Sequence, residues 1–543
     1  MNPNPTIGVA AHEMAVHGLS LIAGGTGRPG PHTFRAINPA SGEALAPEFT
    51  EAAPGEIVAA LDAAMEAFED YRTRPPEKRA RLLESIAAHI ERLGDNLLRR
   101  THLETGLPPG RLQVERARTC GQLRLFAQVV RDGSWVDARI DRAQPERQPA
   151  PRLDIRRMLI PVGPVVVFGS SNFPLAFSVA GGDSASALAA GCPVVVKANR
   201  AHPGTSEMVG RALAAAVAEC GMPAGLFSLI HGGGATVGIA LVQNPSTAAV
   251  GFTGSLEAGK ALCRAAAARA RPIPVFAEMS SLNPVFLLDE ALDTRGPSIA
   301  RDLFASFTLG VGQFCTKPGL VFVQAGAATD AFLHSLASHV RNAASATMLT
   351  PDICHAFTQN RERVTKVPGV TIMAVAGVAA NAGKVQGCPS VAVAPARIFL
   401  AERDLATEAF GPFTLVVIAD SREELLECAR KLDGQLTAAV HGSPGDLARA
   451  SRLLAILQQV AGRIIFNGFP TGVEVSPAMN HGGPYPATSD SRFTSVGTAA
   501  VLRFARPVCY QGAPAELLPP ELRDENPLQL LRLIDGRHTR DSV

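Results

Sequence analysis

From residue 161 onward, short apolar runs rich in valine, isoleucine and phenylalanine alternate with alanine-rich amphipathic stretches. Apolar runs without polar interruption are typical of strands buried on both faces, and the stretches between them have helical spacing. Since each crossover helix covers one face of a parallel sheet, this alternation predicts a doubly wound α/β domain. The expected strands span residues 165–168, 194–196, 227–230, 248–252 and 274–276.

A second alternation of the same kind runs from about residue 283 to about residue 469 and predicts a second α/β domain. We expect its strands at residues 285–288, 319–323, 414–418, 437–440 and 463–466. The cleft between two such domains is the usual place for a cofactor and a substrate to meet.

Three segments lie outside these alternations. Apolar residues recur every three or four positions from residue 52 to residue 106, which predicts helices with a break at Pro75-Pro76. Residues 133–157 combine arginine with proline and glutamine, which favours an exposed connection or an edge strand. The proline and charged content after residue 517 indicates a tail that wraps over the surface.

Charge and cysteine content argue against several classes of function. The chain has 51 Lys plus Arg against 49 Asp plus Glu, a formal charge of +2, so we expect no nucleic-acid or membrane partner and a small-molecule substrate. Nine scattered cysteines without paired spacings resemble neither a disulfide framework nor a zinc site. Residues 1–25 have no basic region before an apolar core, and no apolar run approaches the roughly 18 to 20 residues of a membrane span. We therefore expect a cytoplasmic protein.

The first candidate for cofactor binding is Gly251-Phe252-Thr253-Gly254-Ser255, followed by Gly259. A strand that ends in a glycine turn and opens a helix presents free N–H groups and a helix dipole to a diphosphate. The turn alone is weak evidence, because many α/β proteins have such glycines without a dinucleotide. The glycine run at residues 232–234 is weaker still and is equally well a flexible loop.

Three residues could carry chemistry on a carbonyl group. Cys315 stands in Gly312-Gln313-Phe314-Cys315-Thr316, a loop that lets a thiol protrude for nucleophilic attack, although an ordinary cysteine is a small buried apolar residue. Glu278 ends a predicted strand, where desolvation could raise its pKa toward that of a general base; a solvated strand end or a helix cap is the alternative. Asn172 follows another strand, where its amide could donate to an oxyanion or form an ordinary turn.

Together these motifs resemble the aldehyde dehydrogenase superfamily over nearly the whole chain. The order and the approximate separations match for Asn172, Lys197, the 251–255 turn, Glu278, the 312–316 loop and Glu408-Ala409-Phe410-Gly411-Pro412-Phe413. The resemblance implies an aldehyde dehydrogenase-like α/β fold with a Rossmann-type cofactor domain (residues 1–135 and 159–279) and an α/β catalytic domain (280–485). It also implies a homodimer or homotetramer, a small β oligomerisation element (136–158 and 486–515) and a C-terminal tail (516–543).

The resemblance also implies a mechanism. Cys315 attacks the aldehyde, the Asn172 amide and the Cys315 backbone N–H hold the oxyanion, and hydride passes to the nicotinamide. Glu278 then activates water to release the carboxylic acid. Relatives that pass the thioester to coenzyme A generally lack this base, so its presence favours hydrolysis. The implied cofactor contacts are Lys197, Gly254, Ser255, Gly259, Glu408 and Phe410, and no metal is needed.

Arg200 departs from the pattern of the superfamily. Members that prefer NAD+ usually carry a glutamate three residues after the motif lysine, where it accepts bonds from the ribose hydroxyls, whereas this chain has Lys197-Ala198-Asn199-Arg200. A cation there favours a 2′-phosphate, so we expect NADP+ to be preferred and NAD+ to be the other usable cofactor. The alternative is that Arg200 turns into solvent and the enzyme uses either cofactor.

Residues 466–475, 481–498 and 506–510 resemble one branch of the superfamily, the α-ketoglutaric semialdehyde dehydrogenases (2,5-dioxopentanoate dehydrogenases). These enzymes oxidise a semialdehyde that carries an α-keto acid group to α-ketoglutarate. An anionic substrate needs a cation near the mouth of its pocket, for which Arg492 is the candidate; a structural contact within its loop is the alternative. The candidate apolar walls are Phe173, Phe314, Phe469 and Phe493. Such walls would also suit a fatty or other medium- or long-chain aldehyde.

Two other classes of function are compatible with the motifs. The chain could be a catalytically silent binding protein on the same fold, although a silent relative has no chemical reason to keep Cys315, Glu278 and Asn172 together. It could also be a thioester hydrolase, because the second half of the implied reaction hydrolyses a thioester.

Overall fold

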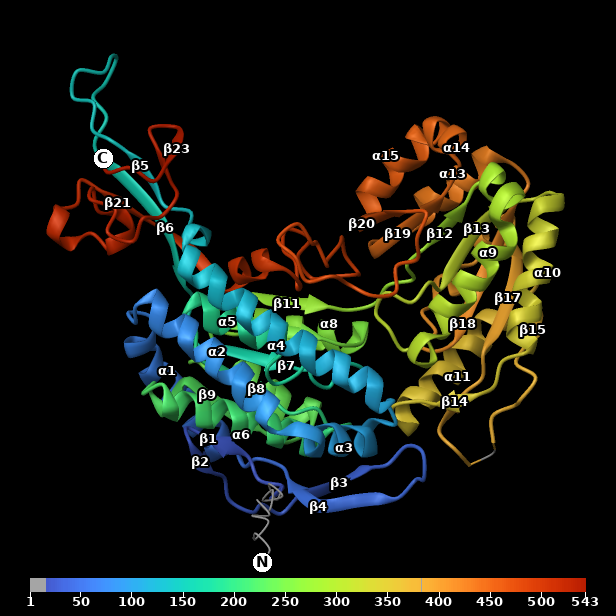
Figure 1. Cartoon of the computed structure of the whole chain (residues 1–543), viewed down its shortest axis with the longest axis horizontal. Helices are drawn as coiled ribbons and strands as arrows, with labels where there is room; N and C mark the ends of the chain where they lie inside the picture. Colours follow the sequence, from blue (N-terminus) through green and yellow to red (C-terminus); the bar gives the residue numbers. More distant parts are fainter. Residues whose placement is uncertain (1–15, 382) are drawn as a thin grey trace, which may run out of the picture.

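The computed structural model describes residues 16–381 and 383–543, in which two α/β units lie side by side and a smaller sheet projects from one end (Figure 1). Residues 1–15 of the segment in which we expected no secretory signal lie outside this range. None of the described helices is long and apolar enough to cross a membrane.

The first sheet confirms the predicted doubly wound pattern. Its five strands β7 to β11 are parallel and overlap the five runs expected from the sequence, and the short strand β1 pairs antiparallel with β9. The order across the sheet is β11 (Val275–Glu278), β10 (Ala249–Thr253), β7 (Val165–Phe168), β8 (Val194–Lys197), β9 (Phe227–Ile230), β1 (Leu21–Ile22) and β2 (Gly25–Thr26).

Helices cover both faces of this sheet. One core contains α2 (Pro76–Arg92), α4 (Pro109–Asp132), α5 (Gly182–Ala190) and α6 (Pro203–Glu219), and the other contains α1 (Pro54–Tyr71), α7 (Ile239–Gln243) and α8 (Leu256–Ala267). In β7, Val165 and Val167 belong to the first core and Val166 belongs to the second. Successive side chains of a strand point to opposite faces, so an uninterrupted apolar run requires helices on both sides.

The predicted helical region at residues 52–106 is also confirmed. It forms α1, α2 and α3 (Gly94–Thr105), and Pro75 and Pro76 stand at the start of α2 as expected. Proline is tolerated in the first turn of a helix because the N–H that it lacks has no partner there.

The second sheet contains all five predicted strands of the second unit and two more at one edge. Its order is β15 (Thr371–Val375), β17 (Ser390–Pro395), β18 (Phe413–Ala419), β13 (Leu320–Gln324), β12 (Val285–Leu287), β19 (Gln435–His441) and β20 (Ala461–Phe466). The sequence did not reveal β15, because this edge strand is mostly exposed and has no continuous apolar run. The helices that follow these strands include α9 (Asp289–Thr308), α10 (Ala327–Arg341), α13 (Arg422–Lys431) and α15 (Ser451–Val460).

The projecting sheet corrects the expectation for the C-terminal tail. The arginine-rich segment supplies β5 (Arg139–Asp141) and β6 (Ile155–Pro161), and the tail supplies β22 (Arg532–Ile534) and β23 (Arg537–Thr539). The order is β21 (Ala505–Gln511), β6, β5, β22, β23. The tail is thus more than a surface wrap, because Leu518, Leu522 and Leu530 are buried with Ile140 of β5.

The remaining helices and strands lie outside the three larger sheets and the helices named above. Their bounds are β3 (Thr33–Ile37), β4 (Ala44–Thr50), β14 (Ala346–Thr347), α11 (Pro351–Thr365), β16 (Gln386–Gly387), α12 (Ala396–Ala401) and α14 (Pro444–Arg449).

Candidate active site

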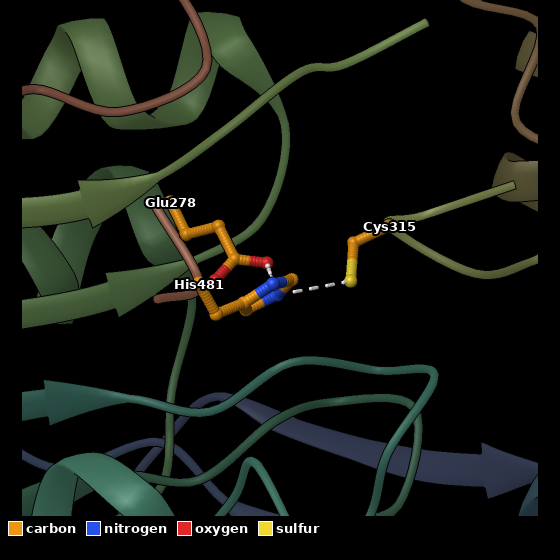
Figure 2. A group of neighbouring side chains, drawn as sticks. All are labelled: Glu278, Cys315 and His481. Atoms are coloured by element: carbon orange, nitrogen blue, oxygen red, sulfur yellow. Dashed lines mark hydrogen bonds and ion pairs between the residues drawn. The ribbon is translucent and has the colours of Figure 1, made fainter. Parts of the chain in front are cut away.

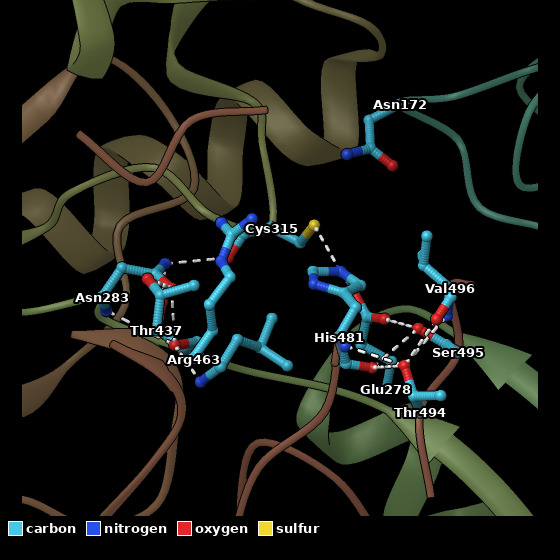
Figure 3. Close-up of polar contacts among 12 residues, drawn as sticks. Asn172, Glu278, Asn283, Cys315, Thr437, Arg463, His481, Thr494, Ser495 and Val496 are labelled. Atoms are coloured by element: carbon cyan, nitrogen blue, oxygen red, sulfur yellow. Dashed lines mark hydrogen bonds and ion pairs between the residues drawn. The ribbon is translucent and has the colours of Figure 1, made fainter. Parts of the chain in front are cut away.

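Cys315, Glu278 and Asn172 come from three separate places in the chain and meet in one region (Figure 3). Cys315 lies in the loop between α9 and β13, Glu278 is the last residue of β11, and Asn172 follows β7. The Asn172 amide nitrogen donates to the backbone oxygen of Gln313, two residues before Cys315, over 3.0 Å. Cys315 itself is half-buried.

The loop that carries Cys315 depends on glycine and on one buried amide. Gly312 has a φ of +67°, and a Cβ built there would lie 2.3 Å from the backbone of Gly411, so this close approach requires glycine. The Asn283 side chain donates to the Cys315 carbonyl oxygen over 2.8 Å, and Thr437 donates to the Asn283 amide oxygen over 2.9 Å. These contacts fix the loop against the second sheet.

Glu278 is 3% exposed, yet both of its carboxylate oxygens have hydrogen-bond partners. Ser495 Oγ donates to Oε2 over 2.7 Å, and Oε1 lies 3.0 Å from His481 Nε2. Burial by itself raises the pKa of Glu278, but His481, Ser495 and the Cys315 thiol together hold this pKa below its ordinary value. The expectation of a raised pKa is therefore wrong in direction, because the buried carboxylate is surrounded by donors.

The surroundings of the Cys315 thiol oppose its ionisation. Burial raises its pKa well above the usual value, the nearby Glu278 carboxylate raises it further, and the Arg118 guanidinium acts in the opposite direction. The resting side chain is therefore a neutral thiol. Attack on a carbonyl requires a base to take its proton.

His481 joins these two groups and was not singled out from the sequence. Its Nε2 lies 3.0 Å from Glu278 Oε1 and 3.5 Å from Cys315 Sγ, and the residue is 1% exposed (Figure 2). The donor atoms of all three side chains lie within 4.8 Å of one another. A metal ion could use such a spacing, but because these groups bond to one another we interpret them as a proton-transfer group.

The candidate cofactor residues gather at the carboxyl ends of adjoining strands. Lys197 ends β8, and the 254–255 turn follows β10, which is separated from β8 only by β7. Burial lowers the pKa of Lys197 to about 8, with a further contribution from the positive charge of Arg200. Ser255 caps α8 by accepting from the Ala258 N–H over 3.3 Å, and a Cβ at Gly259 would strike the Met279 sulfur at 2.6 Å. The Gly254 N–H is already bound to the Glu278 carbonyl oxygen over 3.1 Å and the Ala258 N–H is bound to Ser255, so the N–H groups of Leu256 and Glu257 remain as donors in the first turn of α8.

Arg200 does not simply extend into solvent. Its guanidinium carbon lies 4.5 Å from the centre of the Phe34 ring, and its Nη1 lies 3.7 Å from Glu51 Oε1. Glu51 also acts on Lys197, raising the pKa that burial lowers. The site therefore contains two cations and one carboxylate.

Glu408 and Phe410 lie on the segment that packs against the cysteine loop. Ser280 donates to Glu408 Oε2 over 2.6 Å, and burial raises the pKa of this glutamate. Phe410 is half-buried and immediately precedes Gly411, the residue that Gly312 approaches.

The candidate substrate residues divide into two groups. Phe173 and Phe314 form an apolar cluster with Phe177, with ring centres 5.1 Å and 5.3 Å from Phe173. Phe469 packs instead on His441 at 4.5 Å, and Phe493 packs on Phe276 at 5.1 Å.

Arg492 is a correction to the expectation of a cation for the substrate. Its side chain is 79% exposed, and its guanidinium is bound by both oxygens of Asp490 at 2.9 Å and 2.5 Å. Because its charge is already paired by a residue of its own loop, these contacts favour the structural alternative over a substrate contact.

Arg118, on α4, is the cation that the structure places near the thiol. Its guanidinium carbon lies 5.2 Å from the Phe177 ring centre, and that ring lies 6.4 Å from the His481 ring. Its Nε and Nη2 are buried and have no hydrogen-bond partner among the described residues. Arg118 also lines a cleft of about 530 Å³ between α4 and residues 473–475. Glu474 lines the same cleft and acts on this guanidinium, as does Glu115, so carboxylates already surround it, while two of its N–H groups remain free for a further acceptor.

Arg463 is also close to Cys315 in Figure 3, but its guanidinium donates hydrogen bonds to backbone oxygens of the protein. Its Nη2 donates to the Pro470 carbonyl oxygen over 2.8 Å, and its Nη1 donates to that of Gly472 over 3.2 Å. Arg463 therefore anchors the loop opposite Arg118.

Comparison with known proteins gives consistent matches. A family model described as "Aldehyde dehydrogenase family" matches residues 27–487. The α-ketoglutaric semialdehyde dehydrogenase 2 of Azospirillum brasilense is 51% identical over 521 residues, which cover 96% of this chain and 98% of that protein. The α-ketoglutaric semialdehyde dehydrogenase of Acinetobacter baylyi is 46% identical over 510 residues, or 94% of this chain and 96% of that protein.

Solved structures show the same fold at lower sequence identity. A betaine aldehyde dehydrogenase from Staphylococcus aureus, in complex with NAD+, has a TM-score of 0.78 at 22% identity and covers 92% of this chain and 98% of its own. A 1-pyrroline-5-carboxylate dehydrogenase from Thermus, with bound NAD, has a TM-score of 0.76 at 21% identity and covers 91% of this chain and 92% of its own.

We expect Gly312→Ala to reduce turnover about 100-fold. The added Cβ would push the loop away from Gly411 and move the Cys315 thiol, and a reacting group displaced by about 1 Å can lose this much activity. The added Cβ has both an unfavourable φ and a backbone clash, a strain of about 1–3 kcal/mol. Steady-state kinetics and thermal unfolding measure the two effects. Gly326→Ala is the matched control, because a Cβ there meets nothing within 4 Å. Full activity in Gly312→Ala would show that the loop does not need this geometry.

Proposed function

The chain belongs to the aldehyde dehydrogenase family, and we propose that it oxidises α-ketoglutaric semialdehyde to α-ketoglutarate. Aldehyde oxidation with a nicotinamide cofactor is the reaction of the family. The substrate assignment is supported by the near full-length identity to the two α-ketoglutaric semialdehyde dehydrogenases. The structural feature that supports it is the Arg118 guanidinium, whose Nε and Nη2 have no hydrogen-bond partner in the described residues and which lies on the Phe177 ring of the Phe173 cluster. Glu115 and Glu474 act on this cation through space, and its two free N–H groups suit a short chain ending in a carboxylate.

The nicotinamide dinucleotide, when bound, supplies the acceptor for the hydride. The residues fit this group, because Lys197 is a largely buried cation with no ion-pair partner in the described residues, at the same sheet edge as the first turn of α8. In our proposal Lys197 and Glu408 bind ribose hydroxyls, the Ser255 turn binds the diphosphate, and Phe410 packs near the nicotinamide.

The first half-reaction uses three groups of the chain. Glu278 takes the proton of the Cys315 thiol, and the sulfur forms a bond to the aldehyde carbon. The oxyanion that results is held by the Cys315 backbone N–H and by the second amide hydrogen of Asn172, whose first is bound to Gln313. Loss of hydride from the thiohemiacetal leaves a thioester on Cys315.

The second half-reaction returns the enzyme to its starting state. Glu278 releases its proton to solvent and then removes a proton from the water that attacks the thioester carbon. The carbon–sulfur bond breaks, the acid departs, and the sulfur regains a proton. The low pKa of Glu278 keeps it ready as a base at neutral pH.

We also propose a cytoplasmic homodimer or homotetramer. The nine described cysteines are all free, which suits a reducing compartment, and β21 is an unpaired edge of the projecting sheet in the described chain. Sedimentation equilibrium would give the number of subunits.

We expect the highest kcat/KM with α-ketoglutaric semialdehyde among that compound, succinic semialdehyde and a medium-chain aldehyde, measured by the absorbance of the reduced nicotinamide. Cys315→Ala should remove turnover. Glu278→Gln should form one reduced cofactor per subunit in a slowed first turnover, because the thiol must then lose its proton to solvent, and should turn over about 10²- to 10⁴-fold more slowly in the steady state, because water also lacks its base. Preference for the medium-chain aldehyde would favour the fatty-aldehyde alternative, and turnover that survives Cys315→Ala would eliminate the mechanism.

Arg118→Met should lower kcat/KM for the semialdehyde about 10- to 100-fold, the range of a charge-assisted hydrogen bond, and leave an uncharged aldehyde nearly unaffected. The variant keeps an apolar stem on Phe177 but removes the cation. Arg124→Met is the matched control, because Arg124 lines the same cleft with its guanidinium already bound to Glu91 at 2.7 Å. An equal loss for charged and uncharged aldehydes would assign Arg118 a structural role.

For the cofactor we propose a preference for NADP+, with Arg200 binding the 2′-phosphate. Arg200→Ala should lower kcat/KM for NADP+ about 10-fold or more and change that for NAD+ little. Glu51→Gln should act in the opposite direction, because it removes the carboxylate that lies 3.7 Å from Arg200 and would repel the phosphate. A wild-type enzyme that strongly favours NAD+ would contradict this assignment.

A further inference from the structure

His481 contacts both the proposed nucleophile and the proposed base, yet neither half-reaction described above uses it. Figure 2 shows its imidazole between the Glu278 carboxylate and the Cys315 sulfur. The residue lies in the irregular segment after β20, and its backbone N–H donates to Thr494 Oγ1 over 2.8 Å. This bond to Thr494 fixes the backbone from which the imidazole projects.

The surroundings of the imidazole indicate which nitrogen carries the proton. Nδ1 is buried and has no hydrogen-bond partner among the described residues, whereas Nε2 has two neighbours of acceptor type. A proton on Nδ1 would be a buried donor without an acceptor, which costs about 1–3 kcal/mol. The neutral ring therefore carries its proton on Nε2. Nε2 lies 3.0 Å from Glu278 Oε1 and 3.5 Å from the Cys315 sulfur, so the carboxylate oxygen is the nearer acceptor.

We propose that His481 is a positioning residue that keeps the Glu278 carboxylate ionised and directed at Cys315, an inference that rests on the roles proposed for those two residues. A carboxylate that is 3% exposed would be protonated without donors, and a protonated Glu278 takes no proton from a thiol or from water. His481 holds one carboxylate oxygen, and Ser495 holds the other over 2.7 Å.

The other ionisable groups around Glu278 do not replace this contact. Cys315 faces it from the cysteine loop, Arg118 acts on it through space from α4, and Glu408 and Arg463 act on the neighbouring thiol. Neither Arg118 nor Arg463 forms a hydrogen bond with the Glu278 carboxylate in the described residues. Removal of the imidazole therefore leaves the hydroxyl of Ser495 and the Cys315 thiol as the donors.

The test compares His481→Leu with His481→Gln. Leucine removes the donor, whereas glutamine can present an amide N–H at a similar reach. The rate of thioester hydrolysis after the burst is measured against pH, because this step depends on ionised Glu278. In the wild type the rate should hold at acidic pH, since the pKa of Glu278 is low. In His481→Leu the pKa of Glu278 should rise, so the rate at pH 6 should fall about 10-fold or more, and His481→Gln should restore much of it.

Two further measurements separate this role from others. Alkylation of Cys315 by iodoacetamide against pH reports thiol ionisation. A change in that profile without a change in the hydrolysis profile would overturn the inference, as would equal losses in the leucine and glutamine variants at all pH values. If His481→Leu does not fold, Ser495→Ala tests the same environment and should shift the hydrolysis profile in the same direction; an unshifted profile overturns the inference. Absence of aldehyde oxidation in the wild type would instead contradict the proposed function.

Discussion

The ionised state of one buried carboxylate is the constraint on which the rest of the site depends. Glu278 lies at the end of a parallel strand and is almost fully removed from water, a situation that by itself costs several kcal/mol for a charged group. Hydrogen bonds from Ser495 and His481 offset that cost. Burial and this same carboxylate raise the pKa of Cys315, so the resting thiol is neutral.

The two sheets explain how such a site is assembled. Parallel strands deliver Asn172, Lys197 and Glu278 to one edge of the first sheet, where the carboxyl ends of strands form a crevice. The second unit supplies Cys315 on a loop that only glycine at position 312 allows to pack so closely. The nucleophile and the base therefore meet because the two units face each other.

Much of this arrangement could be predicted from local sequence. Uninterrupted apolar runs such as Val165–Phe168 identified the five parallel strands of the first unit and five of the seven strands of the second sheet, because a strand covered on both faces has no polar side. The position of Glu278 and Asn172 at strand ends then predicted that they lie at one edge. Arg492 could have been interpreted better from the same information, since Asp490 is two residues away and pairs with it.

Local sequence patterns could not identify His481 or Arg118 as residues of the site. His481 is 166 residues from Cys315 and 203 residues from Glu278, so no spacing rule connects them. Arg118 is one of several arginines on α4, and periodicity does not show which of them lacks a partner. The pKa of Glu278 was expected to rise for the same reason, because burial could be inferred and the donors could not.

The most direct test of the central claim is peptide mapping by mass spectrometry of Glu278→Gln, after mixing with the semialdehyde and an oxidised nicotinamide until the slowed first turnover is complete. The account predicts one acyl adduct per subunit, on the peptide that contains Cys315, which persists because the amide is no base. An adduct on another cysteine, or none despite formation of reduced cofactor, would contradict the account.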